Sequence, residues 1–529
     1  MRNKTLQHEI ILSIALMAPV FLLYLAHFTP VEGFKGTGFL TGDMVSYMAN
    51  ARQHFDEDQF RLLYSNPFCM DENCPHIYFQ VQTLLLGLML HLSGGDAGFV
   101  FVFFGIIALF FTIIVTLKFF KDFIGWGTRG HLLSFVLFIY GGGLLILGGF
   151  TYSIFKYNTF SEVLDNILIF DPGGGFWMLN FGRNFAYPTE IYYHLITIGI
   201  IWSIFRKKYF ITSGLLFILS LSHPFYGVQF LLIVIAWQFI ELLFKSKEIK
   251  LIRSLFFNLL IIGFHIYYYL FWMKYFPSHA SLMNQWEMNW TLPAISAILA
   301  YSPLFFILIL TLRKKEMRIH FYKDSFNRLL LIYFFVSLAL ANHELFIKPI
   351  QPIHFTHGHI YIPLFLMVAK YLVDFLNKQN FKLKVVKWAL FLILISDNLT
   401  WYPGVSFIIS TYYPPVSVKM DDSTRKALYF LQENFNDEYI LVSNQNINYL
   451  ASAYTPLKPI FGHDFNTPES EKRKAIFKEI TESFRFQSLD GKKVVFVIDK
   501  NNPDFLDAIT ALKIYKLRLQ NQGYYVFSN

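Results

Sequence analysis

The chain has 529 residues, of which 54% are hydrophobic, 19% aromatic and only 15% charged. A soluble globular protein would carry charge on about a quarter of its residues, so that class is excluded. The apolar residues come in runs of roughly 17–25, the length that crosses the hydrocarbon core of a bilayer. The sequence therefore predicts an all-α polytopic membrane bundle of about 11–13 spans.

The net charge of +9 comes from basic residues in short loops between the apolar runs. Lys and Arg in short loops mark the cytoplasmic side of a membrane protein, so this charge is not a nucleic-acid signal. Arg2 and Lys4 precede the first apolar run, which lacks a small-residue cleavage site and is expected to remain as a span. The long segments 31–75 and 151–190 then lie outside.

The expected spans raise a counting conflict. We expect them near 9–28, 77–92, 97–120, 131–150, 191–205, 209–224, 226–244, 254–275, 292–312, 328–346, 359–376 and 386–401. Three of these lie between the two outer segments, where the number of crossings must be even. The stretch 77–92 is the shortest of the three, and we expect it to be re-entrant.

The character of the chain changes at about residue 415, where charge rises and the long apolar runs stop. Short β-type runs appear at 439–442, 494–498 and 524–527, with helix-type segments at 421–435, 468–484 and 502–514. Strands that alternate with helices predict a small α/β domain with a partly parallel sheet. The sequence thus divides into a transmembrane domain, 1–414, and an outer α/β domain, 415–529.

The outer segment 31–75 contains an amphipathic pattern that begins at Asp43. The apolar residues recur at helical spacing from Met44 to Phe55, which predicts a helix lying on the membrane surface. Asp43 in its first turn is either an N-cap or a catalytic carboxylate at the membrane edge. Cys69 and Cys74 are the only two cysteines, and an outer loop favours a disulfide between them.

The other candidate residues also lie in expected outer loops. They are the acids Asp165, Asp171 and Glu190, the cation Arg183, and the histidines His223, His354, His357 and His359. Each has a simpler interpretation: Arg183 as a snorkelling residue, His223 before Pro224 as a helix break, and the three late histidines as interfacial packing. The late histidines also suit a phosphate contact or a divalent metal ion, the one cofactor that the sequence leaves open. Carboxylates, an Arg and several His on one side suit a reaction between an acceptor hydroxyl and an anionic, lipid-linked donor.

The segment Gly42-Asp43 with Tyr47 and Ala51 forms a Gly-Asp-x-x-x-Tyr-x-x-x-Ala pattern after the first span. With the many spans and the C-terminal α/β domain, it resembles GT-C glycosyltransferases. The resemblance extends to 180–188, to Ser222-His223-Pro224-Phe225-Tyr226, and to the tail residues Phe461-Gly462-His463-Asp464 with Thr467-Pro468-Glu469.

The resemblance implies transfer of a sugar, with inversion, from a polyprenyl-phosphate donor. Asp43 matches the acidic residue of the first outer loop, and Tyr47 follows it in the pattern. Family members often carry an acidic pair there, whereas this chain has Gly42-Asp43, so the second acid stays open among Asp165, Asp171 and Glu190. The Trp-Trp-Asp signature of oligosaccharyltransferases is absent, which argues against transfer of a whole glycan to Asn.

We therefore expect a glycosyltransferase of a bacterial inner membrane whose acceptor is a glycan, a lipid or a protein. The alternative is a transporter or flippase for a lipid-linked or anionic solute. Ionisable residues at mid-span and paired repeats would favour transport; the expected spans are nearly free of charge at mid-depth, and no paired repeat is evident. A third interpretation is an assembly factor of an envelope complex, with the tail domain as its working part.

Overall fold

The computed structural model describes the chain except for residues 1, 71–73, 245–247, 314, 379–380 and 412–416. It divides into two compact units, which we describe separately. The helical unit comprises Met1–Leu23, Gly105–Tyr267 and Glu287–Val405, and the mixed unit comprises Tyr24–Phe104, Tyr268–Trp286 and Ser406–Asn529. The domain boundary expected between 414 and 415 lies outside the described residues, so that division stays a prediction.

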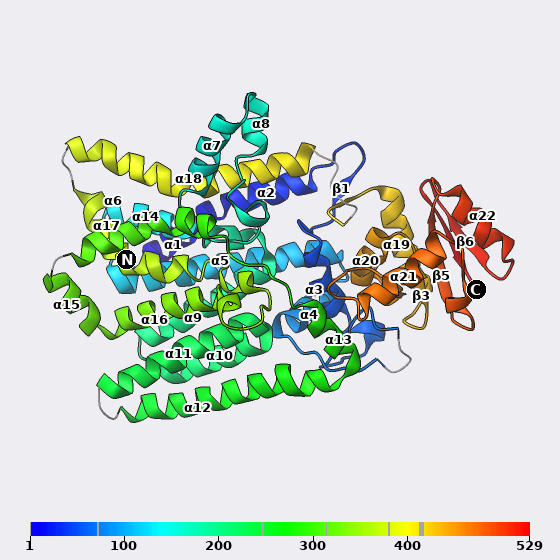
Figure 1. Cartoon of the computed structure of the whole chain (residues 1–529), viewed down its shortest axis with the longest axis horizontal. Helices are drawn as coiled ribbons and strands as arrows, with labels where there is room; N and C mark the ends of the chain where they lie inside the picture. The colour runs from blue at the N-terminus through cyan, green and yellow to red at the C-terminus, as the bar shows by residue number, and fades with distance from the viewer. Residues whose placement is uncertain (1, 71–73, 245–247, 314, 379–380, 412–416) are drawn as a thin grey trace. The chain divides into compact units, whose positions relative to one another are not determined.

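The helical unit consists mainly of helices (Figure 1). Its helices are α1 (Arg2–Leu16), α6 (Arg129–Tyr140), α7 (Leu145–Lys156), α8 (Phe160–Asp165), α9 (Pro188–Phe205), α10 (Tyr209–Ser222), α11 (Pro224–Phe244), α12 (Ile249–Ile266), α14 (Ala294–Leu312), α15 (Lys315–Lys323), α16 (Ser325–Leu340) and α17 (Tyr361–Asn377). Three further helices contain residues of both units: α2 (Ala18–Phe28), α5 (Ala97–Ile124) and α18 (Phe381–Thr411).

Five of the described helices are long and apolar enough to cross a membrane, or up to seven spans if each of two bent helix pairs counts as one. Three shorter apolar helices, Val81–Ser93, Tyr209–Ser222 and Ser325–Leu340, add to these. The chain is an integral multi-pass membrane protein, and the larger number of 11–13 spans stays a prediction.

The predicted span 131–150 is instead two helices, α6 and α7, bent by 65°. Three glycines, 141–143, separate them, and the buried carboxylate of Asp397 accepts hydrogen bonds from Gly143 N at 2.7 Å and Ile146 N at 3.0 Å. Side-chain oxygens that accept from free amides at a helix start stabilise that start. The break in α6–α7 therefore has a definite cause in Asp397.

Helices α10, α11 and α12 lie side by side (Figure 1) and share polar contacts in their interior. Ser213 and Ser254 hydroxyls lie 3.0 Å apart, and Gln238 donates to Ser254 at 3.0 Å and accepts from Asn258 at 2.9 Å. Interhelical hydrogen bonds of this kind hold helices together where lipid supplies no hydrophobic drive.

The mixed unit combines helices with two small sheets. Its helices are α3 (Asp43–Arg52), α4 (Val81–Ser93), α13 (Pro277–Gln285), α19 (Asp422–Asn434), α20 (Gln445–Tyr454), α21 (Ser470–Thr481) and α22 (Pro503–Ala511). Its strands are β1 (Lys35–Gly36), β2 (Lys419–Met420), β3 (Ile440–Val442), β4 (Lys458–Pro459), β5 (Val494–Asp499), β6 (Lys516–Gln520) and β7 (Tyr524–Ser528).

The larger sheet has the order β4-β3-β5-β7-β6. β3 pairs in parallel with β4 and β5, whereas β7 pairs antiparallel with β5 and β6. This partly parallel sheet, with α19, α21 and α22, confirms the α/β character predicted for the tail. The pair β1–β2 is antiparallel and joins the first loop to the start of the tail, with Lys35 opposite Met420.

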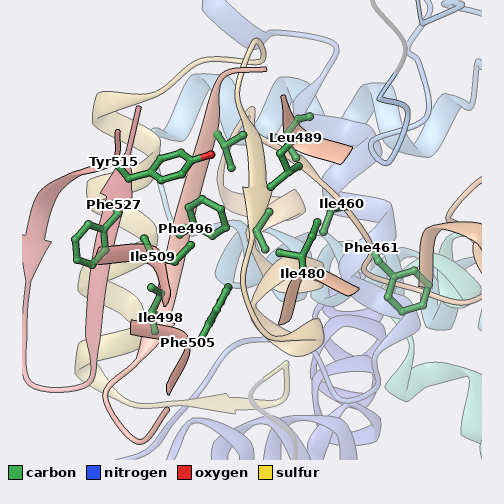
Figure 2. Close-up of a cluster of buried hydrophobic side chains, with 13 residues drawn as sticks. Ile460, Phe461, Ile480, Leu489, Phe496, Ile498, Phe505, Ile509, Tyr515 and Phe527 are labelled. Atoms are coloured by element: carbon green, nitrogen blue, oxygen red, sulfur yellow. The ribbon is translucent and has the colours of Figure 1, made fainter. Parts of the chain in front are cut away.

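The core of the tail is a cluster of aromatic and aliphatic side chains from the sheet and its helices (Figure 2). Phe496 from β5 lies against Phe505 of α22 and against Tyr515, with ring centroids 5.9 and 4.9 Å apart. Ile480 of α21 is fully buried in the same cluster. The tail thus has its own hydrophobic core, which positions the loops described below.

Helix α3 buries its apolar face against protein. Met44 and Met48 are fully buried, and α3 packs against α4 and α20. A Cβ atom on Gly87 of α4 would overlap the carbonyl oxygen of Ala51, so the two helices approach as closely as glycine allows. We expected the apolar face of α3 to lie on the membrane surface, and this expectation is wrong. The face is covered by α20 of the tail, a contact between distant parts of the chain that a local sequence pattern does not reveal.

Candidate functional site

Asp43 is the first residue of α3, and it does not cap the helix. The N-cap position is Gly42, and no side-chain hydrogen bond caps this end. The Asp43 side chain is 69% exposed, and its Oδ1 lies 3.2 Å from Nε2 of His463. The carboxylate therefore faces solvent while one of its oxygens is held by an imidazole.

The orientation of His463 follows from its own contacts. Its Nδ1 accepts a hydrogen bond from the backbone N–H of Phe465 at 3.3 Å. A neutral imidazole that accepts at Nδ1 carries its proton on Nε2. The Nε2–H then points at Asp43, so His463 acts as a hydrogen-bond donor to the carboxylate.

Tyr449 of α20 packs against the imidazole of His463. Its ring centroid lies 4.9 Å from that of His463, and it stacks on Phe68 at 6.0 Å. Burial, and then the negative charge of Asp43, raise the pKa of the Tyr449 phenol, so the phenol stays neutral. The Asp43–His463 pair thus rests on a packed aromatic surface.

The tail loop that carries His463 is tied to the first loop and to α13. Asn66 Nδ2 donates to the carbonyl of Asn466 at 2.9 Å, and Trp286 Nε1 donates to the carbonyl of Phe465 at 2.9 Å. Gly462 lies against the Phe68 ring, with no room for a side chain. One of the tail residues that the sequence resemblance singled out, His463, therefore lies beside Asp43.

Two other features of the first loop lie nearby. The structure joins Cys69 and Cys74 in a disulfide with a Cα–Cα distance of 5.9 Å. Tyr47 is half-buried on α3, and its ring stacks on Phe101 with centroids 6.3 Å apart. Both features order the segment from which Asp43 projects.

The helical unit contains a separate buried cluster around Glu190, in the first turn of α9. Glu190 accepts from the hydroxyl of Tyr226, and its Oε2 lies 3.2 Å from Nδ1 of His357. His223 packs against Tyr226 with ring centroids 4.6 Å apart. The cluster brings together three of the candidate residues, Glu190, His223 and His357, whose role in a site stays a prediction.

The two remaining candidate histidines lie at the edges of this cluster. His354 stacks on Phe225 at 4.8 Å, and its Nε2 lies 2.7 Å from Oε1 of Gln351. Burial lowers the pKa of His354 well below its ordinary value, so its ring is neutral. His359 is fully buried, with Nδ1 2.7 Å from the hydroxyl of Tyr333.

Arg183 is fully buried and forms an ion pair with Asp171. Its guanidinium also lies 5.5 Å from the ring centroid of Trp401, and it donates to the carbonyl of Asp397 at 3.5 Å. Such a guanidinium does not reach lipid headgroups, as a snorkelling residue would. Asp165, by contrast, is exposed at the end of α8, and no ion pair within the described residues engages it.

Among the residues that the structure describes, no three His, Cys, Asp or Glu side chains are arranged to hold one metal ion. Metal binding at His354, His357 and His359 stays a prediction.

Sequence reasoning passed over three residues that the structure makes prominent. His463 and Tyr226 stood in quoted motifs, but their partners Asp43 and Glu190 lie far away in the sequence. Asp397 carried a usable signal, because a lone carboxylate inside an apolar helix is expensive unless it has partners.

Comparisons with known proteins place this fold. No protein-family model matches the sequence, and the search of curated proteins found no match. Among solved structures, ArnT from Cupriavidus metallidurans in the apo state is similar, with a TM-score of 0.50 at 10% identity over 99% of this chain and 98% of that one.

Two further structures show weaker likeness. The archaeal oligosaccharyltransferase AglB from Archaeoglobus fulgidus, in complex with an inhibitory peptide and a dolichol-phosphate, has a TM-score of 0.46 at 12% identity, over 93% of this chain and 69% of that one. ArnT bound to undecaprenyl phosphate has a TM-score of 0.46 at 10% identity, over 98% and 97%. At such identities a likeness speaks for the fold alone: the chain shares its fold with the apo ArnT structure, in agreement with the fold that the resemblance to GT-C glycosyltransferases implies.

Proposed function

We propose that the chain is a glycosyltransferase that moves a sugar, with inversion, from a polyprenyl-phosphate-linked donor to an acceptor hydroxyl. The GT-C fold supports glycosyl transfer in general. The observation that carries the proposal is the Asp43–His463 pair: a carboxylate that is exposed to an incoming substrate and yet held at 3.2 Å by an imidazole.

In this mechanism Asp43 is the general base. The acceptor hydroxyl transfers its proton to the free carboxylate oxygen, and its oxygen attacks the anomeric carbon from the face opposite the phosphate. The bond from that carbon to the phosphate oxygen breaks, and the electron pair leaves with the polyprenyl phosphate. General-base help of this kind is worth roughly 10²–10⁴ in rate.

His463 is a positioning residue in this mechanism. Its Nε2–H donates to one oxygen of Asp43 and so fixes the carboxylate plane, while the second oxygen stays available. The packing of Tyr449 and the hydrogen bond from Phe465 hold the imidazole in turn.

The side of the membrane on which the reaction takes place follows from the distribution of basic residues. The positive-inside pattern supports a site on the outer face of a bacterial inner membrane, with the tail outside. The acceptor is a glycan, a lipid or a protein with a free hydroxyl. Arg183 is buried and paired with Asp171, so we do not assign binding of the donor phosphate to Arg183.

The first prediction tests Asp43 in the purified full chain, reconstituted in nanodiscs. A panel of polyprenyl-phosphate sugars is supplied with water as the acceptor, and released polyprenyl phosphate is measured. We expect Asp43→Asn to lower the release rate by about a hundredfold or more, because an amide cannot take the proton. The amide oxygen still accepts from His463, so thermal stability should change little.

The matched control is Asp464→Asn, which removes a carboxylate one residue from His463 that pairs instead with Lys474 at 3.3 Å. It should keep nearly full activity, and His463→Gln should lose less than Asp43→Asn. Equal rates for wild type and Asp43→Asn would remove Asp43 as the base. If none of the sugars in the panel were released by wild type, while labelled lipid crossed the bilayer of proteoliposomes, a flippase would replace the enzyme.

A further inference from the structure

Two cavities adjoin each other in the mixed unit, away from Asp43. Their volumes are about 440 and 450 Å³, and they share Arg52, Asp56 and Pro456 in their walls. Cavities of this size suit small ligands or parts of larger ones.

The first cavity combines aromatic surfaces with amides. Phe55, Tyr429 and Phe435 line it together with the side-chain amides of Gln432 and Asn436. Its carboxylates are Asp56, paired with Arg52, Asp96, paired with Arg425, and the exposed Asp58, so the anionic group of a ligand belongs in the other cavity. Aromatic rings offer flat apolar faces, and amides offer both donors and acceptors. This mixture fits a sugar ring, which has one apolar C–H face and a rim of hydroxyls.

The second cavity adds positive charge. Arg61 and Lys458 line it, and neither forms a salt bridge with a carboxylate among the described residues, whereas Arg52 is paired with Asp56. The acids that face this cavity are Asp56, already paired, and Asp437. Two cations thus face one unpaired carboxylate, which leaves a net positive wall for an anionic group.

Helix α3 relates these cavities to Asp43. Asp43 begins the helix and Arg52 ends it, so they are separated by about 14 Å along the axis. The same nine residues make about two and a half turns of the helix, so positions 43 and 52 lie on opposite sides of it. Asp43 lines neither cavity, so the part of a ligand that fills them does not lie against Asp43.

We propose that the two cavities form an anchoring site for an anionic saccharide, in which aromatic residues hold sugar rings and Arg61 and Lys458 hold a carboxylate or phosphate. This inference rests on the proposed function, because the saccharide would be a remote part of the acceptor. Binding energy from remote parts of a substrate raises the efficiency of transfer at the reacting centre.

The experiment measures binding to the full chain in nanodiscs of zwitterionic lipid, by calorimetry. The probes are trigalacturonate, which is anionic, and maltotriose, which is neutral and of similar size. We expect trigalacturonate to bind at least about tenfold more tightly. Arg61→Ala and Lys458→Ala should remove this preference, and Tyr429→Ala should weaken both probes.

The matched control is Lys516→Ala, which removes an exposed cation elsewhere in the same unit and should leave both affinities unchanged. A loss of the preference in this variant would show that general charge attracts the probe and would overturn the site. An anionic lipid headgroup could occupy the cavities in place of a saccharide, and nanodiscs that contain phosphatidylglycerol test this. If this lipid strongly reduced the binding of trigalacturonate, the cavities would be a site for lipid headgroups.

Separate measurements test the anchoring site and the glycosyltransferase function. Asp43→Asn should bind trigalacturonate as tightly as wild type, since Asp43 does not line the cavities. Binding without any turnover of polyprenyl-phosphate sugars would keep the anchoring site and reject the proposed function. Turnover without preference for trigalacturonate would do the reverse.

Discussion

The Asp43–His463 pair joins residues that are far apart in the chain but 3.2 Å apart in space. Local pattern identified Asp43 from its place at the start of an amphipathic segment. It could not identify the partner, because the proximity depends on α20 packing against α3 and on Gly462 lying flat against Phe68. The position of Asp43 at the membrane edge stays a prediction; in the structure its exposed carboxylate lies beside His463 in the loop of the tail.

The sequence identified Asp171 and Arg183 as separate candidates, but it did not predict the ion pair between them. Burial raises the pKa of Asp171 from 3.8 to about 6, although Arg183 acts in the opposite direction. The effect of burial is the larger one because the Asp171 side chain is almost wholly enclosed. The raised pKa predicts a specific dependence of stability on pH.

The prediction concerns wild type compared with Asp171→Asn. Between pH 3.8 and about 6 the folded protein holds a proton that the unfolded chain has lost. The stability that wild type gains from this proton is full below about pH 4 and is lost as the pH rises to 6, by about 3 kcal/mol. Thermal unfolding of both proteins from pH 4 to 8 checks it.

Asp165→Asn is the control, because Asp165 is exposed. Removing this exposed carboxylate should change the unfolding temperature little. A difference between wild type and Asp171→Asn that does not change with pH would contradict the raised pKa.

At the scale of elements, the tail was the most predictable part of the chain. The strands β3, β5 and β7 and the helices α19, α21 and α22 all fall within a few residues of the expected ranges. β4 has only two residues and β6 reads Lys-Leu-Arg-Leu-Gln, so neither has the apolar run that marks a buried strand. The bend between α6 and α7 was missed because its cause, Asp397, lies in another helix.

The contact between α3 and α4 predicts the effect of one methyl group. Gly87→Ala would push a Cβ atom into the carbonyl oxygen of Ala51, so α3 would have to shift. We expect a lower unfolding temperature and a lower transfer rate, because Asp43 moves with α3. Gly263→Ala is the control: it lies in α12 with open space around it, and alanine favours helix. If both variants unfolded like wild type, the close approach of α3 and α4 would be wrong.

For the whole molecule, the orientation in the membrane is the main expectation that needs a direct measurement. Single cysteines at Glu479 and at Lys207, both exposed, probe the tail and a short basic loop. We expect a membrane-impermeant maleimide to label Glu479→Cys in intact cells and Lys207→Cys only after lysis. If Lys207→Cys were labelled in intact cells and Glu479→Cys only after lysis, the expected orientation would be wrong and the proposed site would lie on the cytoplasmic face.

The order of the larger sheet has a consequence for how copies of the protein meet. A sheet with open edges invites strands from another chain. Here one edge strand, β4, has two residues and ends at Pro459, and the other, β6, carries Lys516 and Arg518 and a bulge between Leu517 and Leu519. A short strand, a proline, two positive charges and a bulge all oppose edge-to-edge pairing. Neighbouring copies crowded in one membrane should therefore not extend this sheet into one another.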